Sequence, residues 1–396
     1  MFNTQALPEL DHDPFAEDVL RWPDGYHAAL RETDVVWLPQ YGVLATGRYD
    51  VVRHILTDWK TFCSSAGIGL TNFHKEKPWR PPSLVLEHDP PEHTRARAII
   101  MRALSPVVLR RLRTLFEAEA ERAVSRIIAM AAFDAVTELA EGYPLKVFGD
   151  AVGIIAQDRQ TMLRYGNIAF NALGPRNRLF LRSQEEAEPV TRWVMQQCRR
   201  EALDPRGLGA IMYAAADAGE VSEEEAAMLV RSFLSAGVDT TVRALGAALS
   251  CFAEEPEQWR ILKSEPQRAR AATEEAIRFA SPFQTVFRTT ATDTMLNGIE
   301  VAKGQKILLS LAAANRDPRR WENPDRFDIT RNAAGHLGFG TGIHGCVGQM
   351  LARLEIEVLL GEMARRIATI ERIGDIDFDL NNTTRGLSRL PLRVST

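Results

Sequence analysis

The sequence has few cysteines, and their spacing excludes the usual cysteine-based architectures. Only four occur in 396 residues, and no two of them form a C-x-x-C motif. A zinc ribbon or a disulfide framework requires closely spaced or paired cysteines, so we expect neither. Isolated cysteines fit a reducing compartment, and we expect a cytoplasmic protein. The four cysteines are at positions 63, 198, 251 and 346.

Long apolar runs and a basic N-terminal segment are also missing. No uninterrupted apolar stretch approaches the ~18 residues that a membrane-spanning helix needs. Residues 1–20 carry five acidic side chains and no Lys or Arg, which is the wrong charge for a signal peptide. We therefore expect no membrane anchor and no export.

An excess of positive charge is absent as well. The formal net charge is -4, which argues against nonspecific nucleic-acid binding as the main task. Hydrophobic residues make up 45% of the chain and charged residues 25%, as in ordinary globular proteins with a sizeable core. Length alone allows two or three domains, although long single domains exist.

A glycine-rich segment near the C-terminus carries the last cysteine. It runs from Phe339 to Gly348, with glycines at 340, 342, 345 and 348, and we expect a helix to begin at Cys346. The free amide groups and the positive dipole end of that helix favour a thiolate. Glycines allow the backbone to pass close to a flat, bulky group. A single thiolate presented in this way is suited to be the protein ligand of a haem iron.

Two other interpretations of this loop remain open at this point. Residues 340–345 match G-x-G-x-x-G, the pattern of a dinucleotide phosphate loop. That interpretation lacks its context, because residues 333–338 make a poor strand and too little chain follows for a mononucleotide-binding half. The second alternative is a buried structural cysteine in a glycine turn, which is the commoner fate of a lone cysteine.

The order of predicted elements is mainly helical with a smaller β-rich part. Residues 35–46 predict a short hairpin, and residues 105–280 have helical patterns with short breaks, including one at 171–178. After Ser281 the pattern changes to short strands, with Asn297 and Gly298 as a hairpin turn.

A predicted helix over residues 228–241 has polar residues where a core helix would be apolar. Gly237, Asp239 and Thr240 stand in its middle, and hydroxyl groups there can bond to carbonyls one turn earlier and bend the helix. Two interpretations fit. Gly237 ends one helix and Asp239 caps the next, or an acid and a hydroxyl face a ligand at a widened point.

Charged residues form three further patterns. Glu275 and Arg278 are three apart on a predicted helix, a spacing worth only ~0.2–0.5 kcal/mol by itself. His93 and Arg97 are four apart and share a helix face that can grip a carboxylate. Between His93 and Arg113 the chain has several arginines and no acid, which predicts either a docking patch for an acidic partner or a merely solvated face.

Together these motifs resemble the cytochrome P450 monooxygenases, and the likeness covers essentially the whole chain. The resemblance implies a mainly α fold with a small β-rich region, in one domain over residues 1–396, with haem b between a long central helix and the helix after Cys346. Such enzymes use O2 and two electrons. Asp239 and Thr240 match the family's proton-relay pair, and a buried ion network is implied for Glu275, Arg278 and Arg326.

The same resemblance assigns the cofactor and redox-partner residues. Cys346 is the expected iron ligand, and the missing anchor fits the family's soluble bacterial branch, which receives electrons from an iron-sulfur ferredoxin. The expected cofactor-binding residues are His93, Arg97, Arg288, Phe339, Gly340, His344, Cys346 and Gly348. The expected ferredoxin patch comprises Arg95, Arg102, Arg110, Arg111 and Arg113.

Residues 77–84 and 230–235 resemble the bacterial P450s that demethylate para-methoxybenzoate. The resemblance implies oxidation of the para substituent of an aromatic acid, whose carboxylate would be bound by Arg80, Ser83, Ser232 and Ser235 with Arg231 nearby. Leu173 and Val286 replace phenylalanines of that subfamily, so we expect a reshaped pocket. The expected walls are Leu86, Phe170, Leu173, Phe283 and Val286. The alternatives are another small hydrophobic substrate, a non-catalytic haem protein, or a nicotinamide dehydrogenase.

Overall fold

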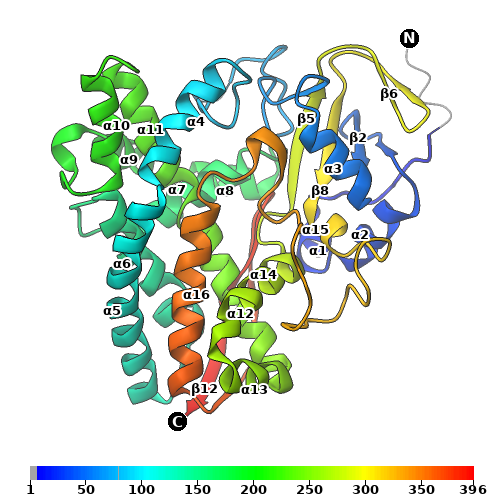
Figure 1. Ribbon diagram of the computed structural model, residues 1–396. Helices are drawn as coiled ribbons and strands as arrows, with labels where there is room; N and C mark the ends of the chain where they lie inside the picture. The colour runs from blue at the N-terminus through cyan, green and yellow to red at the C-terminus, as the bar shows by residue number, and fades with distance from the viewer. Residues whose placement is uncertain (1–6, 79) are drawn as a thin grey trace.

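A helical region and a smaller sheet-containing region make up the protein, as Figure 1 shows. The computed structural model describes residues 7–78 and 80–396. Its α-helices are α1 Glu17–Arg21, α2 Asp24–Glu32, α3 Tyr49–Thr57, α4 Glu92–Ala103, α5 Pro106–Met130, α6 Gly142–Val152, α7 Gln160–Asn171, α8 Arg178–Gln184, α9 Ala187–Gln197, α10 Leu208–Asp217, α11 Glu223–Ala236, α12 Asp239–Glu254, α13 Pro256–Ser264, α14 Ala269–Ala280, α15 Leu311–Asn315 and α16 Gln349–Arg366. Shorter helical turns are η2 Val136–Glu141, η3 Arg200–Ala202, η4 Pro266–Arg268 and η5 Gly342–His344.

The strands form one mixed sheet and three smaller sheets. The five-stranded sheet has the order β1-β2-β8-β5-β3, in which β2 and β8 are parallel and the other pairs antiparallel. The remaining sheets have the orders β4-β12-β9, β10-β11 and β6-β7. The strands are β1 Val36–Leu38, β2 Val43–Thr46, β3 Phe62–Cys63, β4 Ala132–Asp134, β5 Thr285–Thr290, β6 Thr294–Leu296, β7 Ile299–Val301, β8 Lys306–Ser310, β9 Thr369–Arg372, β10 Asp377–Leu380, β11 Arg385–Arg389 and β12 Pro391–Ser395.

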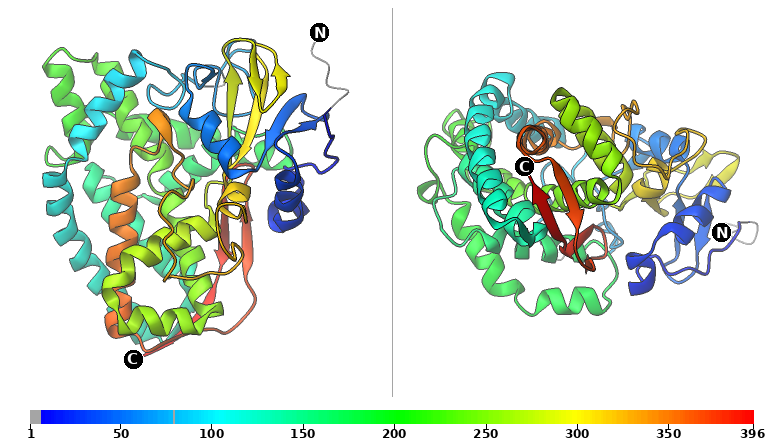
Figure 2. Two further views of the ribbon diagram at one scale, coloured as in Figure 1. Left: turned by 45° about the vertical axis from the view of Figure 1, so that its right-hand side comes forward. Right: turned by 90° about the horizontal axis from the view of Figure 1, so that it is seen from below.

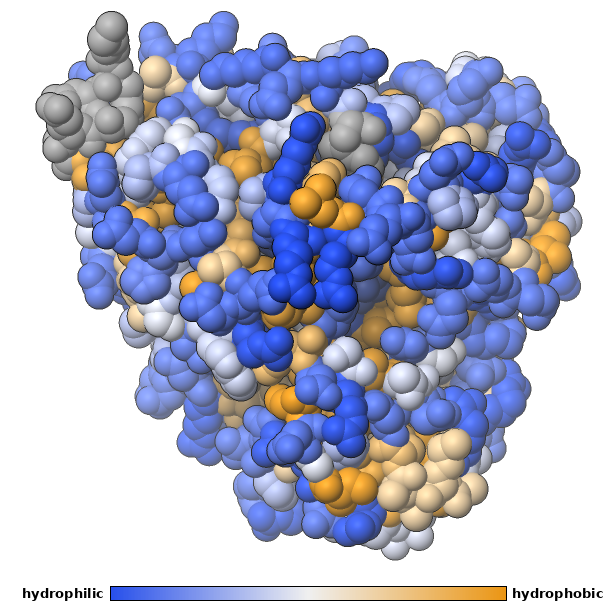
Figure 3. Space-filling model, turned by 180° about the vertical axis from the view of Figure 1, so that it is seen from behind, coloured by the Kyte–Doolittle hydropathy of each residue, from blue (hydrophilic) through white to orange (hydrophobic). Residues whose placement is uncertain are grey.

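Helix packing places the C-terminal helix in the middle of the helical region. α16 packs against α5 and α14, and it lies beside α5 in both views of Figure 2. Its inward residues, such as Leu359 and Leu360, have no exposed surface, because apolar burial drives this packing. The face seen in Figure 3 is largely hydrophilic with scattered apolar residues. Within residues 7–78 and 80–396, no helix has both the length and the apolar character to cross a bilayer.

Several local predictions are confirmed. The hairpin over residues 35–46 is the β1–β2 pair, and the turn between β6 and β7 has positive φ at Asn297 and Gly298. The break at residues 171–178 separates α7 from α8. The predicted family fold is mainly helical with a small sheet region, and the structure has that architecture.

Two helix predictions need correction. The helix after the cysteine begins at Gln349 rather than at Cys346, with a short 3-10 turn before it. Residues 228–241 belong to two helices, as one of the two interpretations had it: α11 ends before Gly237 and α12 begins at Asp239, but the N-cap residue is Val238 and not Asp239. A Cβ on residue 237 would lie 2.1 Å from the ring of Phe148 in α6. Only glycine therefore allows α11 to end this close to α6.

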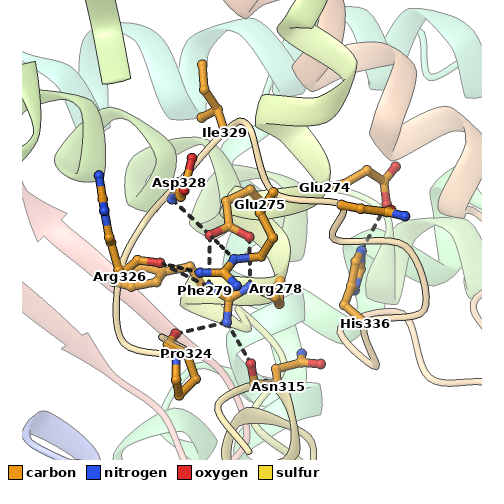
Figure 4. Close-up of polar contacts among 12 residues, drawn as sticks. Glu274, Glu275, Arg278, Phe279, Asn315, Pro324, Arg326, Asp328, Ile329 and His336 are labelled. Atoms are coloured by element: carbon orange, nitrogen blue, oxygen red, sulfur yellow. Dashed lines mark hydrogen bonds and ion pairs between the residues drawn. The ribbon is translucent and has the colours of Figure 1, made fainter. Parts of the chain in front are cut away.

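A buried ion network ties α14 to the segment that precedes the cysteine loop (Figure 4). Glu275 and Arg278 have fully buried side chains and are joined by two hydrogen bonds of 2.7 and 2.8 Å. Arg278 also donates to the carbonyls of Asn315 and Pro324 at 2.8 and 3.0 Å. Because each charge has several partners, the pair tolerates complete burial.

The third member of this network differs from the expectation. Arg326 contributes only its main-chain carbonyl, 3.3 Å from Arg278, and its side chain points away in Figure 4. Besides Arg278, the second guanidinium that reaches the Glu275 carboxylate belongs to Arg331, at a distance of 3.3 Å. The Arg326 side chain is exposed, so it is Arg331 that completes the network.

We predict that Arg278→Ala lowers the free energy of unfolding by about 3–5 kcal/mol, because it leaves the Glu275 carboxylate buried without its main counterion. Chemical denaturation measures this difference. The matched control is Arg372→Ala, whose 3.2 Å pair with Glu254 joins side chains that are 41% and 48% exposed. A surface pair is worth about 0–1 kcal/mol. Equal losses in the two variants would contradict the assignment of the network as a stabilising element.

Candidate active site

A large cavity lies between the α11–α12 break and the cysteine loop. One wall includes Gly237, Thr240 and Ala244, and the facing wall is the segment from Gly338 to Gly348. Polar groups enter the remaining, largely apolar lining from the 80–86 segment and from the last turns of α11. The cavity therefore joins the three regions in which the sequence predicted functional residues.

The Cys346 side chain opens into this cavity. The other three cysteines are buried, and none of them lines it. Burial raises the pKa of the Cys346 thiol, although the amides of Gly348 and Gln349 and the charge of Arg97 oppose that rise. The amides at the helix start thus act in the direction expected for a stabilised thiolate. A coordinated metal ion would favour the thiolate further.

Glycines shape the loop around Cys346. Gly340 and Gly342 have φ values of 64° and 72°, a region that side chains disfavour. A Cβ on residue 342 would lie 2.5 Å from the carbonyl oxygen of Leu56, so the loop also approaches α3 closely. The Cys346 N–H donates to the carbonyl of Phe339 at 2.8 Å and turns the thiol toward the cavity side of the loop.

Cationic side chains gather near the same loop. Arg97, Arg288 and His344 line the cavity, and Arg288 is 4% exposed. His344 Nε2 lies 3.2 Å from Asp89 Oδ1 and its Nδ1 lies 3.3 Å from the carbonyl of Val85. Burial lowers the pKa of Arg288 to about 10, which leaves it charged at neutral pH.

His93 lies behind His344 rather than in the cavity wall. The two ring centroids are 4.3 Å apart, and His93 is 2% exposed. Burial lowers the pKa of His93 to about 4, with the charges of His344 and Arg97 adding to the effect. Neither ring nitrogen has a hydrogen-bond partner among the described residues. A buried polar group without a partner is costly, so these nitrogens are suited to a bound acceptor or a bridging water.

The donor set fits a haem group. One thiol faces the cavity from a glycine loop that leaves room for a flat ring, and two guanidiniums with one imidazole line the same part of the cavity. The two carboxylates of a porphyrin require such charged donors when they are taken out of water.

The expected proton-relay pair is divided between the cavity and the protein interior. Thr240 lines the cavity, and its hydroxyl donates to the carbonyl of Ala236 at 2.9 Å. Asp239 is buried beside it and accepts from Arg243 Nε at 2.7 Å, and Arg243 reaches the half-exposed Asp379 at 2.6 Å. Burial raises the pKa of Asp239, although Arg243 opposes the rise.

The residues expected to bind a carboxylate all line the cavity. Ser232 and Ser235 donate to carbonyls of their own helix at 3.1 and 3.3 Å, and the Ser83 hydroxyl accepts from the amide of Leu86 at 3.3 Å. Trp79, which belongs to the segment that carries the resemblance, lies outside the described residues. The cavity-lining members of this set are Arg80, Ser83, Arg231, Ser232 and Ser235.

The expected apolar walls are also brought together. The rings of Phe170 and Phe283 meet edge to face with centroids 5.7 Å apart. Such contacts hold flat side chains in defined orientations. The lining apolar residues of this part are Leu86, Phe170, Leu173, Phe283 and Val286.

Comparison with known proteins decides the family. The sequence profile described as "Cytochrome P450" matches residues 26–368. The chain belongs to the cytochrome P450 family. It is 48% identical to cytochrome P450 CYP199A2 of Rhodopseudomonas palustris over 98% of this chain and 95% of that protein. It is 29% identical to the steroid C26-monooxygenase of Rhodococcus jostii, over 93% and 81% of the two chains.

Solved P450 structures superpose on nearly the whole chain. CYP109Q5 from Chondromyces apiculatus has a TM-score of 0.81 at 30% identity and covers 97% of this chain and 98% of its own. Cytochrome P450 CREJ in complex with (4-ethylphenyl) dihydrogen phosphate has a TM-score of 0.85 at 26% identity, over 97% and 99% of the two chains. P450 proteins bind haem through a cysteine thiolate, so haem is the cofactor and the protein is a monooxygenase.

Two acidic residues of this P450 were not foreseen. Glu274 accepts from Arg353 at 3.1 Å and lies 3.0 Å from His336 Nε2, so it holds both flanks of the cysteine loop. Glu355 lines the cavity, and neither of its carboxylate oxygens has a partner among the described residues. The role of Glu275 is visible in the sequence because Arg278 is only three residues away. The partners of Glu274 are 62 and 79 residues away, so no local pattern indicates them.

We predict that Glu274→Gln destabilises the P450 at neutral pH and that the difference disappears in acid. Burial alone would raise the pKa of Glu274, but hydrogen bonds from His336 and Arg353 lower it from 4.5 to about 2. Its contribution, on the order of 2 kcal/mol, is therefore complete above pH ~4.5 and is lost as the pH falls toward ~2. Urea denaturation of both proteins across this range measures the difference.

The control for this prediction is Glu371→Gln. Glu371 is 63% exposed and pairs with Arg393 at 3.4 Å, so its loss should change stability by no more than about 0–1 kcal/mol at any pH. A Glu274→Gln difference that persists unchanged from neutral to acidic pH would show that the carboxylate charge does not hold the loop.

Proposed function

We propose that this P450 oxidises the para substituent of a small aromatic carboxylic acid, by O-demethylation or hydroxylation of a 4-substituted benzoate. The observation that carries the proposal is the cluster of two guanidiniums and three hydroxyls that line a largely apolar cavity, in addition to the charged residues near the cysteine loop. A carboxylate that enters such a cavity must be met by charge and hydrogen-bond donors.

The places of the cavity-lining residues support this orientation. Ser232 lies in α11, and Thr240 lies in the first turn of α12, beyond the break at Gly237 and Val238. In this proposal an acid held near Ser232 directs its para group toward Thr240 and the cysteine loop. Orientation of this kind decides which carbon reacts.

One related structure holds a ligand with a similar layout. The CREJ structure holds (4-ethylphenyl) dihydrogen phosphate, in which an acidic group and an alkyl group stand para to each other on one ring. The chain is 48% identical to CYP199A2 over nearly all of both proteins.

In this proposal Cys346 ligates the haem iron, and Arg97, Arg288, His344 and His93 hold the two carboxylates of the porphyrin. Phe339, Gly340 and Gly348 form the loop face against the ring. Haem bound through a thiolate supplies the chemistry that activates O2 with two electrons. A methoxy group hydroxylated on its carbon collapses to a phenol and formaldehyde, and the second oxygen atom leaves as water.

The chain contributes proton handling beside this chemistry. The Thr240 hydroxyl faces the cavity, and Asp239, with its raised pKa, is adjacent in the chain. We propose that Thr240 orders water at the haem face and that Asp239 exchanges protons with it. Proton delivery by positioned side chains requires this proximity.

A second candidate is the oxidation of a small neutral substrate. The ion pair between Arg80 and Glu87, with hydrogen bonds of 2.7 and 3.0 Å, favours it. Ser232 and Ser235 also favour it, because both hydroxyls already donate to carbonyls of their own helix. A cavity whose donors are all engaged internally has no need of a substrate carboxylate.

Electrons are proposed to come from an iron-sulfur ferredoxin that docks near α4 and α5. Most arginines of the expected patch are paired with acids from other elements: Arg95 with Glu225, Arg102 with Glu220 at 2.8 Å and Arg113 with Glu357 at 2.9 Å. Arg111 donates to the carbonyl of Arg206, and Arg110 has no ion pair among the described residues. We therefore centre the proposed patch on Arg110 and Arg111.

We predict that para-methoxybenzoate shifts the ferric protein strongly from low to high spin and that its methyl ester shifts it little. The physical reason is that only the acid compensates the buried guanidiniums. Ser232→Ala should weaken binding of the acid about tenfold, since it removes one hydrogen bond to a charged group. Absorbance titration of the haem band measures both.

Ser264→Ala is the matched control, because Ser264 also donates to its own helix, at 2.9 Å, but does not line the cavity. It should bind the acid as the unmodified protein does. Equal responses to acid and ester would favour the neutral-substrate candidate.

We predict that Thr240→Ala diverts electrons from product to peroxide by about tenfold or more, because the hydroxyl that orders water at the haem face is lost. Thr240→Ser should restore most of the coupling, since it keeps that hydroxyl. Product, peroxide and consumed reductant are measured together. Unchanged coupling in Thr240→Ala would remove Thr240 from the proton path.

A further inference from the structure

Glu87 is a fully buried acid beside the cavity that the proposed function does not use. Its side chain has no exposed surface, and it accepts from both terminal nitrogens of Arg80, at 2.7 and 3.0 Å. The amide of Ser83 donates to the same carboxylate at 2.8 Å. Two residues of the expected carboxylate site, Arg80 and Ser83, are thus already bound to a carboxylate that belongs to the chain.

The second guanidinium of this cluster is placed beside the first. Arg80 and Arg231 both donate to the carbonyl oxygen of Pro81, each at 3.0 Å. Arg231 is 5% exposed and lines the cavity, and among the described residues that carbonyl is its hydrogen-bond acceptor. A carbonyl carries no net charge, so it does not neutralise the guanidinium.

The charges of the cluster therefore do not cancel. Arg80 and Arg231 contribute two positive charges and Glu87 one negative charge, which leaves one positive charge in a buried place. Burying an uncompensated ion is costly, and the cost is removed by one ligand anion. A neutral ligand leaves the positive charge uncompensated, and a dianion leaves a negative one.

We propose that Glu87 is a specificity-determining residue that sets the charge of the ligand: it holds Arg80 in an internal ion pair, so that the cavity accepts monoanions and discriminates against dianions. The proposal rests on the aromatic-acid function and adds to it. Glu87 acts through Arg80 and is a positioning residue, and Arg231 with the serines meets the ligand carboxylate.

The test compares two ligands of similar shape and different charge. The dianion is 4-methoxyphthalate and the monoanion is 4-methoxy-2-nitrobenzoate, whose nitro group replaces the second carboxylate at nearly the same size. At about pH 8 every carboxyl group is ionised. Absorbance titration of the ferric protein and calorimetry give the two affinities, and their ratio removes effects of size.

The unmodified protein should bind the monoanion at least about tenfold more tightly than the dianion. Glu87→Gln retains the size of the side chain and an acceptor for the Ser83 amide, but it releases the charge of Arg80. We expect it to bring the ratio to about one or to reverse it. The double variant Arg80→Gln, Glu87→Gln returns the cluster to one positive charge and should restore the preference for the monoanion.

The outcomes separate this inference from the proposed function. If the unmodified protein binds para-methoxybenzoate but Glu87→Gln leaves the ratio within about twofold of its original value, Glu87 does not set the charge. A uniform loss of affinity for both anions in both variants would assign Glu87 a structural role and overturn the inference. An unmodified protein that binds no aromatic acid overturns the proposed function itself.

Discussion

Compensation of buried charge is the constraint on which the arrangement around the cavity depends. Arg278 holds the loop that precedes the cysteine segment, Glu274 holds both flanks of that segment, and Arg243 joins α12 to β10. In each case a charge that cannot remain unpaired in the interior draws together elements that are distant in the chain. Apolar packing alone would bury these elements without defining where the loops cross the cavity.

Sequence reasoning succeeded where the physical cause is local. Asn297 and Gly298 specify a hairpin because a two-residue turn requires positive φ, which Asn and Gly adopt readily. Both residues have positive φ in the structure. The glycines around Cys346 predicted that the backbone passes close to another group. The structure has such a contact at Gly342, where a Cβ would collide with the backbone of α3. The family fold followed because four motifs occur in the right order.

The parts that sequence reasoning missed depend on partners that are remote in the chain. Nothing near Glu274 indicates Arg353, and nothing near Asp239 indicates Asp379, because pairing over such separations is decided by the fold. Arg326 and Arg331 show the same limit at short range. Both are arginines in one loop, and only the path of the backbone decides which guanidinium reaches Glu275.

Asp239 and Thr240, an acid and an alcohol that are adjacent in sequence, have different surroundings in the structure. Neighbouring residues of a helix point about 100° apart, and here Asp239 and Thr240 face different surroundings. Thr240 lines the cavity, whereas Asp239 faces Gly166 of α7 and Arg243. A Cβ on residue 166 would come within 2.9 Å of the Cβ of Asp239. The small residue in α7 leaves room for the acid, and Arg243 supplies its counterion. The two side chains therefore differ in their partners: Thr240 lines the cavity, and Asp239 pairs with Arg243, which also reaches the half-exposed Asp379.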